Sequence, residues 1–528
     1  VHTYTMFTDD VLCSRIQHAI PKTFLSNSMQ YSNAFFDTSG DLYLAGSNYK
    51  SLLGLGLTDQ KVEKWLKSPI KFVTGDFGEE HSIFIDENGG AWAAGNAAFG
   101  AVGLNIVNDS TVGSFTKITE YCLDYNDGSG DIVDIPSEHK WISASCQTKT
   151  SFLLDANGDV WACGYNTASD GNAGLNITSD AAVNIPVFTR INKYDDGSGV
   201  KNIPDNHRWV SIISGSYHCI LIDSSGIAWS FGYNAQGGAL GLDSSGHKMF
   251  PTKVTNYDTG TGSVSIPVDH KWVSGACGYS HTVLIGSDGY AYSAGRNASY
   301  QLADISTEHK YVFTQINHTG RVSKVACGLE HTLLLKTDGT VYSSGINNYG
   351  QIGMGNEYSD TYGTITLEHP VTDIAGHSYS SSLISDNIVH VFGGSGTYGI
   401  DTQHSSVPIM SSNQITVPHL VCGNINGTRL DLNCDHGQKV QIKNGGLTIA
   451  VAEYYESSGH WYKRFRIESG SYLFTPDGRL YNSNGLEVYE SKPGTSDDRL
   501  KLNEKYITDC SCLLKLKPQM YDKLNELN

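Results

Sequence analysis

Apolar residues in this chain come in short paired runs. Between Val273 and Gly295, two runs rich in β-branched and aromatic residues, HTVLI and YAYSA, are separated by a turn that contains Gly289. Runs of this length and composition around a glycine turn predict a β-hairpin. The segments on either side, KWVSGA and FTQI, supply two more predicted strands. The unit is therefore four antiparallel strands without a helix.

The hairpin recurs in register along the chain. Each copy has a turn glycine, an aromatic residue three positions later and a second glycine three positions after that. The second glycines lie 48 to 69 residues apart, so three copies of a unit of about fifty residues carry insertions. This period and this unit predict the blades of a propeller. The turn residues are Gly40, Gly89, Gly158, Gly226, Gly289, Gly339 and, in a weaker seventh copy, Asn387, which His390 and Gly393 follow.

Turn chemistry agrees with this interpretation. Several turns open with aspartate, as in Asp86-Glu-Asn-Gly89. Aspartate at this place caps backbone N–H groups, and glycine adopts the positive φ that closes the turn. The aromatic residues Trp92, Trp161 and Trp229 are expected at equivalent buried positions.

The repeats resemble those of the regulator-of-chromosome-condensation family, whose unit runs Gly-x-x-His, a hairpin, an aromatic residue and Gly-x-Asn-x-x-Gly-x-x-Gly-Leu. The resemblance covers about residues 22 to 410, with six copies in register, and implies an all-β, seven-bladed β-propeller over residues 22–412. Residues 1–21 are expected to supply a strand for ring closure. The string stands here as Gly215 to His218 with Gly232, Asn234, Gly237, Gly241 and Leu242, and again from Gly328 to Gly353.

Residues 413–528 are predicted to form a smaller, mainly β region that ends in a short helix. Two segments within it, Leu420–Gly423 and Phe474–Tyr481, look like parts of another repeat. Either an eighth unit is split by some forty residues, or a surplus strand closes the ring by pairing with the N-terminus. We favour closure, because a closed ring leaves no unpaired edge.

Composition narrows the choice of function. A net charge of −18 without a stripe of lysine and arginine argues against nucleic acid as a partner. The low lysine and arginine content, with abundant Gly, Ser, Asn, Thr and Tyr, favours a secreted, cell-surface or virion protein over a cytoplasmic one. No apolar run reaches the length of a membrane span, so no membrane insertion is expected. The chain starts at Val1, which leaves open whether a signal peptide was removed.

No catalytic or metal site is expected from the histidines and cysteines. His81, His218, His281 and His331 share one repeat position, which Ser32, Thr150 and Tyr379 fill elsewhere, so the position calls for a hydrogen-bonding side chain. No nucleophile and base motif accompanies them. Cys146, Cys277, Cys327 and Cys422 also share a position and are expected in the core, and Cys510-Ser-Cys512 lacks a partner pair at zinc spacing. We therefore predict no cofactor.

Three consecutive units carry cognate insertions. The connection from Ile316 to Cys327 takes 11 residues, whereas the three matching connections take 28, 23 and 23. Each insertion should form a protruding hairpin, and together they should make a crest on one face that carries the contact surface. Exposed tyrosines offer contact area at low entropic cost. The candidate binding residues are Tyr125, Asn126, Asp127, Tyr194, Asp195, Asp196, Tyr257, Asp258 and Thr259.

Two features of the insertions have structural interpretations. Their Asp-rich turns miss the order of a calcium loop, so ordinary Asp-Gly turns are expected. Trp141, Trp209 and Trp272, which end the insertions, are expected to pack between blades.

The sequence thus predicts a non-enzymatic scaffold or surface-recognition protein that binds another macromolecule, foremost a protein, through propeller loops. Two alternatives stay open. One is a virion or cell-surface carbohydrate-binding module, with a glycan as ligand. The other, which the family resemblance implies, is a guanine-nucleotide exchange factor for a small GTPase, although no exchange-specific residues can be identified.

Overall fold

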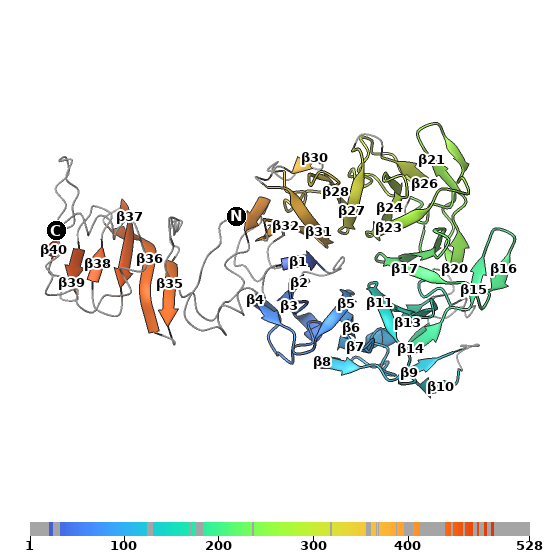
Figure 1. Ribbon diagram of the computed structural model, residues 1–528, viewed down its shortest axis with the longest axis horizontal. Helices are drawn as coiled ribbons and strands as arrows, with labels where there is room; N and C mark the ends of the chain where they lie inside the picture. The colour runs from blue at the N-terminus through green and yellow to red at the C-terminus, as the bar shows by residue number, and fades with distance from the viewer. Residues whose placement is uncertain are drawn as a thin grey trace. The chain divides into compact units, whose positions relative to one another are not determined.

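The computed structural model describes residues 32–394, apart from gaps at 124–129, 168–170, 176–182, 235–236, 317–318, 355–360, 366, 368 and 387, together with the strands at 21–24 and 405–410 and those between 439 and 489. Within residues 18–416, seven sheets form the blades of a closed propeller (Figure 1). The predicted all-β, seven-bladed fold is confirmed.

In each blade four strands pair antiparallel in chain order, with the first innermost (Figure 1). Blade 1 comprises β1 (Pro21–Phe24), β2 (Ser32–Asp37), β3 (Leu42–Ser47) and β4 (Lys61–Lys67), and blade 2 comprises β5 (Phe72–Phe77), β6 (His81–Asp86), β7 (Ala91–Asn96) and β8 (Thr111–Lys117). Blades 6 and 7 comprise β27 (Val322–Cys327), β28 (His331–Lys336), β29 (Val341–Gly345), β30 (Thr361–Ile365), β31 (Val371–His377), β32 (Ser380–Ser385), β33 (Ile388–Gly393) and β34 (Ser405–Met410). Short 3-10 turns follow β3 and β7 at Tyr49–Ser51 and Ala98–Gly100.

Blades 3, 4 and 5 have six strands, because each insertion forms a two-stranded hairpin. The first strand of that hairpin pairs parallel with the outermost strand of the following blade. Blade 3 holds β11 (Trp141–Cys146), β12 (Thr150–Asp155), β13 (Val160–Asn166) and β14 (Val183–Arg190), and blade 4 holds β17 (Trp209–Ser214), β18 (His218–Asp223), β19 (Ala228–Gly232) and β20 (Lys248–Lys253). Blade 5 holds β23 (Trp272–Cys277), β24 (His281–Gly286), β25 (Ala291–Gly295) and β26 (Lys310–Gln315). The inserted hairpins are β9 (Glu120–Cys122) with β10 (Ile132–Asp134), β15 (Lys193–Asp195) with β16 (Val200–Asn202), and β21 (Asn256–Asp258) with β22 (Ser263–Ser265).

The insertions therefore lie at the outer rim of three neighbouring blades, where Figure 1 places β10, β16 and β21. The expected crest on one face is wrong in this respect. The reason is that the last strand of a blade presents an unpaired edge, and backbone hydrogen bonds to that edge direct the hairpin outward rather than upward.

Contacts between blades 1 and 7 close the ring. The innermost strand β1 contacts β31 and β32. Asn33 donates a buried hydrogen bond to Ser382 at 2.7 Å, and Phe35 and Trp65 pack in one apolar cluster with Ile384. Side-chain packing thus joins blades 1 and 7, and among the described strands no pairing joins β1 to a strand after residue 410, so closure by a surplus strand stays a prediction.

A separate six-stranded sheet follows in the C-terminal part of the chain. Its strands pair in chain order, and the segment resembling a repeat hairpin contributes β38 and β39 to it. Leu420–Gly423 and the predicted helix lie outside the described residues. The strands are β35 (Lys439–Asn444), β36 (Leu447–Ser457), β37 (His460–Ile467), β38 (Tyr472–Phe474), β39 (Leu480–Asn482) and β40 (Glu487–Tyr489).

The core lies between facing blades and has the predicted composition. Trp161 and Trp229 are buried, and Trp92, at the equivalent place, is partly buried. Trp141, Trp209 and Trp272 begin the innermost strands of their blades and are 2–3 % exposed, which confirms their packing role. The equivalent cysteines of blades 3, 5 and 6 are free and buried as expected, and Cys422 lies outside the described residues.

Candidate interaction surfaces

Strand order gives the propeller two distinct faces. Because strands alternate in direction, the hairpin turns between the second and third strands share one face with the connections to the next blade. We call this the turn face. The opposite face, which we call the loop face, carries the loops between first and second strands and between third and fourth strands.

Backbone hydrogen bonds join neighbouring blades on the turn face. The first residue of an innermost strand donates its N–H to the turn glycine of the preceding blade, as Trp141 does to Gly89 at 2.9 Å and Trp209 to Gly158 at 2.9 Å. The turn glycines have φ near +80°, as predicted. This face is therefore a ring of fixed turns.

The candidate tyrosines at the rim pack inward. Tyr194 lies 5.1 Å from Trp229, between ring centroids, and Tyr257 lies 5.2 Å from His270. Both are partly buried against the core clusters of their blades. The prediction that they are exposed tips is wrong, because the parallel pairing of β15 and β21 turns these side chains onto the blade. Tyr125, Asn126 and Asp127 lie outside the described residues.

The acidic candidates stabilise their own turns. Asp195 accepts N–H bonds from Gly197 and Gly199 at 2.9 and 3.1 Å, and Asp258 accepts the same two bonds from Gly260 and Gly262 at 2.7 and 3.0 Å. Asp196 pairs with Lys201 at 2.7 Å. These contacts support the interpretation as ordinary Asp-Gly turns. Thr259 is partly buried beside the exposed glycines of its turn.

The outer strands of the rim hairpins are the exposed part. All residues of β10, β16 and β22 are exposed. Val133, Val200 and Val264 lie on these strands and are 38 %, 50 % and 45 % exposed. Each strand pairs on one side only and so presents a free backbone edge. The exposed side chains of the hairpins are therefore those of the outer strands, and a binding role for the hairpins stays a prediction.

A partly buried histidine supports each of the three hairpins. His139 lies 4.3 Å from the Trp141 ring centroid, and His207 and His270 repeat this contact in the next two blades. Burial lowers the pKa of His139, although the carboxylate of Asp155 acts in the opposite direction. These histidines hold the connection between the rim and the innermost strand.

The repeated Gly-x-x-His histidines link blades rather than strands of one blade. His81 bonds Ser151 of the next blade at 2.7 Å, and His218 bonds Thr282 at 2.7 Å. The preceding glycine is required by sterics, because a Cβ at Gly278 would lie 2.1 Å from the His281 ring. Burial lowers the pKa of His81 to about 4 and that of His281 to about 3, so these rings are neutral at physiological pH.

The seventh blade fills this position with a different residue from the one predicted. Ser380, not Tyr379, pairs with the last glycine of the hairpin, as His331 does with Gly345. The cause is a shifted starting point: Gly376 pairs with Ser381 as Cys327 pairs with Thr332 in blade 6, so His377 and not Gly376 takes the place of the repeat glycine Gly328.

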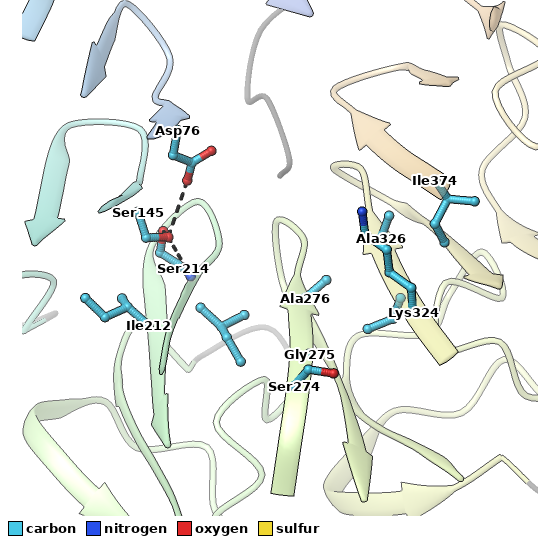
Figure 2. A pocket seen from close by; sticks show the side chains of 12 residues that line it. Asp76, Ser145, Ile212, Ser214, Ser274, Gly275, Ala276, Lys324, Ala326 and Ile374 are labelled. Atoms are coloured by element: carbon cyan, nitrogen blue, oxygen red, sulfur yellow. Dashed lines mark hydrogen bonds between the residues drawn. The ribbon is translucent and has the colours of Figure 1, made fainter. Parts of the chain in front are cut away.

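A cavity of about 190 Å³ lies between the innermost strands of blades 2 to 7. Figure 2 shows Asp76, Ser145 and Ser214 joined on one side and Lys324 on the other. Asp76 accepts the Cys146 N–H at 2.8 Å and the Ser145 hydroxyl at 3.3 Å, and Lys324 forms an ion pair with Asp373. The polar groups thus stabilise one another across blades. The described residues contain no cluster of metal-ligating side chains.

An open groove of about 770 Å³ lies on the loop face, over blades 1 to 4. Its lining includes Glu79, Glu80, Phe99, Lys149 and Tyr217. The Lys149 ammonium lies 4.3 Å from the centre of the Phe99 ring, and burial together with Glu80 raises the pKa of Glu79. Because the Lys149 ammonium already occupies the face of the Phe99 ring, the groove does not indicate a specific ligand.

Comparison with known proteins agrees with the repeat pattern. Residues 288–335 and 322–351 match the regulator of chromosome condensation (RCC1) repeat. The mouse serine/threonine-protein kinase Nek9 is 23 % identical over 280 residues, which are 52 % of this chain but only 25 % of the kinase. The chain therefore spans about a quarter of that relative's length.

Solved structures share the fold. Human WBSCR16 superposes with a TM-score of 0.56 at 16 % identity, over 70 % of this chain and 94 % of that one. Yeast RCC1 (Prp20), solved bound to Kap60, superposes with a TM-score of 0.55 at 17 % identity, over 79 % and 89 %. A further structure of Prp20p from Saccharomyces cerevisiae, described with binding to Gsp1p and histones, gives a TM-score of 0.55 at 18 % identity, over 78 % and 91 %. No helix among the described residues is long and apolar enough to cross a membrane.

Proposed function

We propose that this chain, a seven-bladed propeller built of RCC1-type repeats, is a non-enzymatic module that binds a protein partner at the rim of blades 3 to 5. The observation that carries the proposal is the free edge formed by β10, β16 and β22. Three neighbouring blades carry this added outer strand, each with an exposed valine, whereas the four-stranded blades end in their own fourth strand.

The physical argument is that an exposed strand edge tends to pair with another chain, so a protein that keeps such edges uncovered often pairs them with a partner. An exposed strand edge offers N–H and C=O groups that a partner strand can pair with, and aliphatic side chains beside it add apolar area. Edge strands that have to avoid pairing are usually short and carry charged side chains. The strands β10, β16 and β22 are short, but Val133 and Val264 occupy the central positions of β10 and β22, and Val200 is the first residue of β16.

A pair of matched variants tests the rim. V200K/V264K places two lysines on the rim edges, whereas V107K/I305K places the same two charges at valine and isoleucine residues on the loop face that are 52 % and 65 % exposed. In affinity capture from native material, a genuine partner is retained by the unchanged chain and by V107K/I305K and is lost with V200K/V264K. Equal capture by all three proteins would show that the rim is not the site.

Tests on the captured partner distinguish protein binding from the two alternative functions, nucleotide exchange and carbohydrate binding. If the captured protein is a small GTPase, release of a fluorescent guanine nucleotide with and without this chain measures exchange activity, as resemblance to yeast RCC1 suggests testing. Capture that is abolished by glycosidase treatment would instead identify a carbohydrate ligand. The rim proposal requires a partner that survives this treatment and that binds without accelerating nucleotide release.

A further inference from the structure

A basic residue stands directly before the innermost strand in five consecutive blades. Sequence spacing hides this pattern, because the residues are separated by whole repeats, but the ring brings them to one place in each blade. Since innermost strands begin at the turn face, all five lie on that face. They are Lys71, Lys140, Arg208, Lys271 and Arg321, and we call them the basic arc.

Packing fixes the stems of these side chains. The aliphatic part of Lys140 lies against the turn glycine Gly89 of the preceding blade, where an added Cβ would be 2.8 Å from Cδ. Arg208 and Lys271 lie in the same way on Gly158 and Gly226, where an added Cβ would be 2.6 Å from the Arg208 Cδ and 2.8 Å from the Lys271 Cδ. A long basic side chain whose stem is packed loses less conformational freedom on binding. The charged ends are therefore partly preorganised.

The charges of the arc are available to a partner. Lys71 has its Nζ 3.7 Å from Glu87, and the charge of Arg208 acts on the carboxylate of Asp159 from beyond ion-pair distance. Lys271 donates to the backbone carbonyl of Val268 at 3.3 Å, and Arg208 donates to that of His207 at 2.7 Å. Within the described part of the chain, Lys140, Arg208, Lys271 and Arg321 form no ion pair with a carboxylate. This is notable in a protein with a net charge of −18.

Exposed aliphatic residues accompany the basic arc. The innermost strands of blades 2 to 5 shift register after their first residue, and this bulge leaves the second residue out of the ladder. The second residues are all β-branched and more than half exposed: Val73 54 %, Ile142 52 %, Val210 55 % and Val273 55 %. Each lies two positions after an arc residue, so charge and apolar surface alternate around the turn face.

We propose that the turn face binds an acidic protein segment that carries apolar side chains. Its carboxylates would meet the basic arc, and its apolar side chains would cover the four aliphatic residues. Charge complementarity excludes a basic segment, and the aliphatic positions give a nucleic acid nothing to bind. The proposal names the partner chemistry for the protein-binding function proposed above and in that sense rests on it, but it concerns a different surface from the rim edges.

Fluorescence anisotropy with a synthetic probe tests this proposal on the full chain. The probe is a labelled peptide of three Glu-Leu-Glu-Ser repeats. The test variant is K140E/R208E/K271E. The matched control is K50E/K149E/K248E, which makes the same change in net charge with lysines of the loop-face loops and the strand that follows one of them. Thermal melting establishes that both variants are folded.

We expect the test variant to raise the Kd of the probe by more than about tenfold, which corresponds to about 1.4 kcal/mol, and the control to leave it within about twofold. A probe with glutamine in place of glutamate should not bind, and one with serine in place of leucine should bind more weakly. Equal loss in both variants would reduce the effect to net charge and overturn the proposal. Tighter binding of a labelled single-stranded DNA than of the peptide would overturn it too.

The rim variant V200K/V264K distinguishes this proposal from the previous one. It leaves the basic arc unchanged, so the peptide should bind it as well as it binds the unchanged chain. Loss of the native partner with retained peptide binding supports both proposals. If V200K/V264K still retains the native partner while K140E/R208E/K271E loses the peptide, the rim proposal alone is wrong.

Discussion

Asp86, Asp155 and Asp223 each use both carboxylate oxygens. One oxygen of Asp155 accepts the N–H groups of Asn157 and Asp159, both at 2.9 Å, and the other accepts the indole N–H of Trp161 at 3.1 Å. The sequence predicted the first task from the turn alone. The second depends on the side chain six residues later, which returns beside the turn because the strands are antiparallel.

We therefore expect Asp155→Ala to destabilise the propeller by about 1–3 kcal/mol, because it leaves three buried or partly buried donors without an acceptor. The control is Asp338→Ala in blade 6, where the aspartate is exposed, accepts from Thr340 and pairs with Lys336, and makes no bond to an aromatic side chain. Chemical denaturation measures both. Equal losses in the two variants would contradict the role assigned to the indole bond.

The buried histidines make the ring sensitive to acid. Burial lowers the pKa of His81, His218 and His331 to about 4 and that of His281 and His377 to about 3, below the ordinary 6.5. Between these values the unfolded chain binds more protons than the folded one, so stability falls as pH falls from about 6.5 towards 4. Each histidine contributes up to about 1.4 kcal/mol per pH unit in this window.

The expected outcome is a midpoint of thermal unfolding that drops steeply between pH 6.5 and 4.5 and changes little between pH 7 and 8. His281→Gln should lower the midpoint at pH 7.5, because the bond to Thr332 is altered, but should make the decline towards acid shallower. Thr332→Val removes the same hydrogen bond but no titratable group, so it is the comparison and should keep the original slope. Parallel slopes for all three proteins would show that the buried histidines do not govern the acid response.

At the scale of elements, the inserted hairpins are parts of their blades and not appendages. Tyr194 in β15 packs on Trp229, and β15 hydrogen-bonds in parallel to β20. A residue that sequence reasoning assigned to binding thus contributes to the core. We expect Tyr194→Ala to cost about 1–3 kcal/mol of stability and Tyr194→Phe to be nearly neutral, as measured by chemical denaturation. The folded Tyr194→Ala protein should still capture the partner. Loss of capture would indicate that Tyr194 contacts the partner, as the sequence predicted.

At this scale, the sequence predicts the features that neighbouring residues determine and that recur in each repeat. The Asp-Gly turns, the histidine position and the tryptophans at strand starts each follow from neighbouring residues, and the structure bears them out. The direction of the insertions could not be read, since it depends on β9 pairing with β14, which is more than sixty residues away. Tyr379 was misplaced because the position was counted from Gly376, whereas His377 stands at the place of the repeat glycine in this blade.

At the scale of the whole molecule, ring geometry creates surfaces that the linear sequence conceals. Lys140, Arg208 and Lys271 are ordinary isolated charges in the sequence, 63 to 68 residues apart. In the ring they occupy equivalent places in adjacent blades. The absence of a basic stripe in the sequence therefore did not exclude a basic surface, although it still argues against the density of charge that nucleic acids require.

Ring closure gives the final prediction. Blades 1 and 7 meet through the bond between Asn33 and Ser382 and the cluster of Phe35, Trp65 and Ile384. If this interface is sufficient, a chain ending at residue 416 should melt in one transition at the temperature of the full-length propeller. A chain ending at residue 367 lacks blade 7 and exposes both closing surfaces, so it should lose the cooperative transition and aggregate on heating, since every blade relies on two neighbours to bury its apolar faces.

Scanning calorimetry of the three lengths decides between the two modes of closure. Should the chain ending at residue 416 melt many degrees lower or without cooperativity, a strand beyond that residue must complete the ring, and the closure first expected from the sequence would be correct after all. Asn33→Ala and Trp65→Ala in the shorter chain then provide the sharper measurement. Both should lower its midpoint because these two side chains belong to the contact between the first and the last blade.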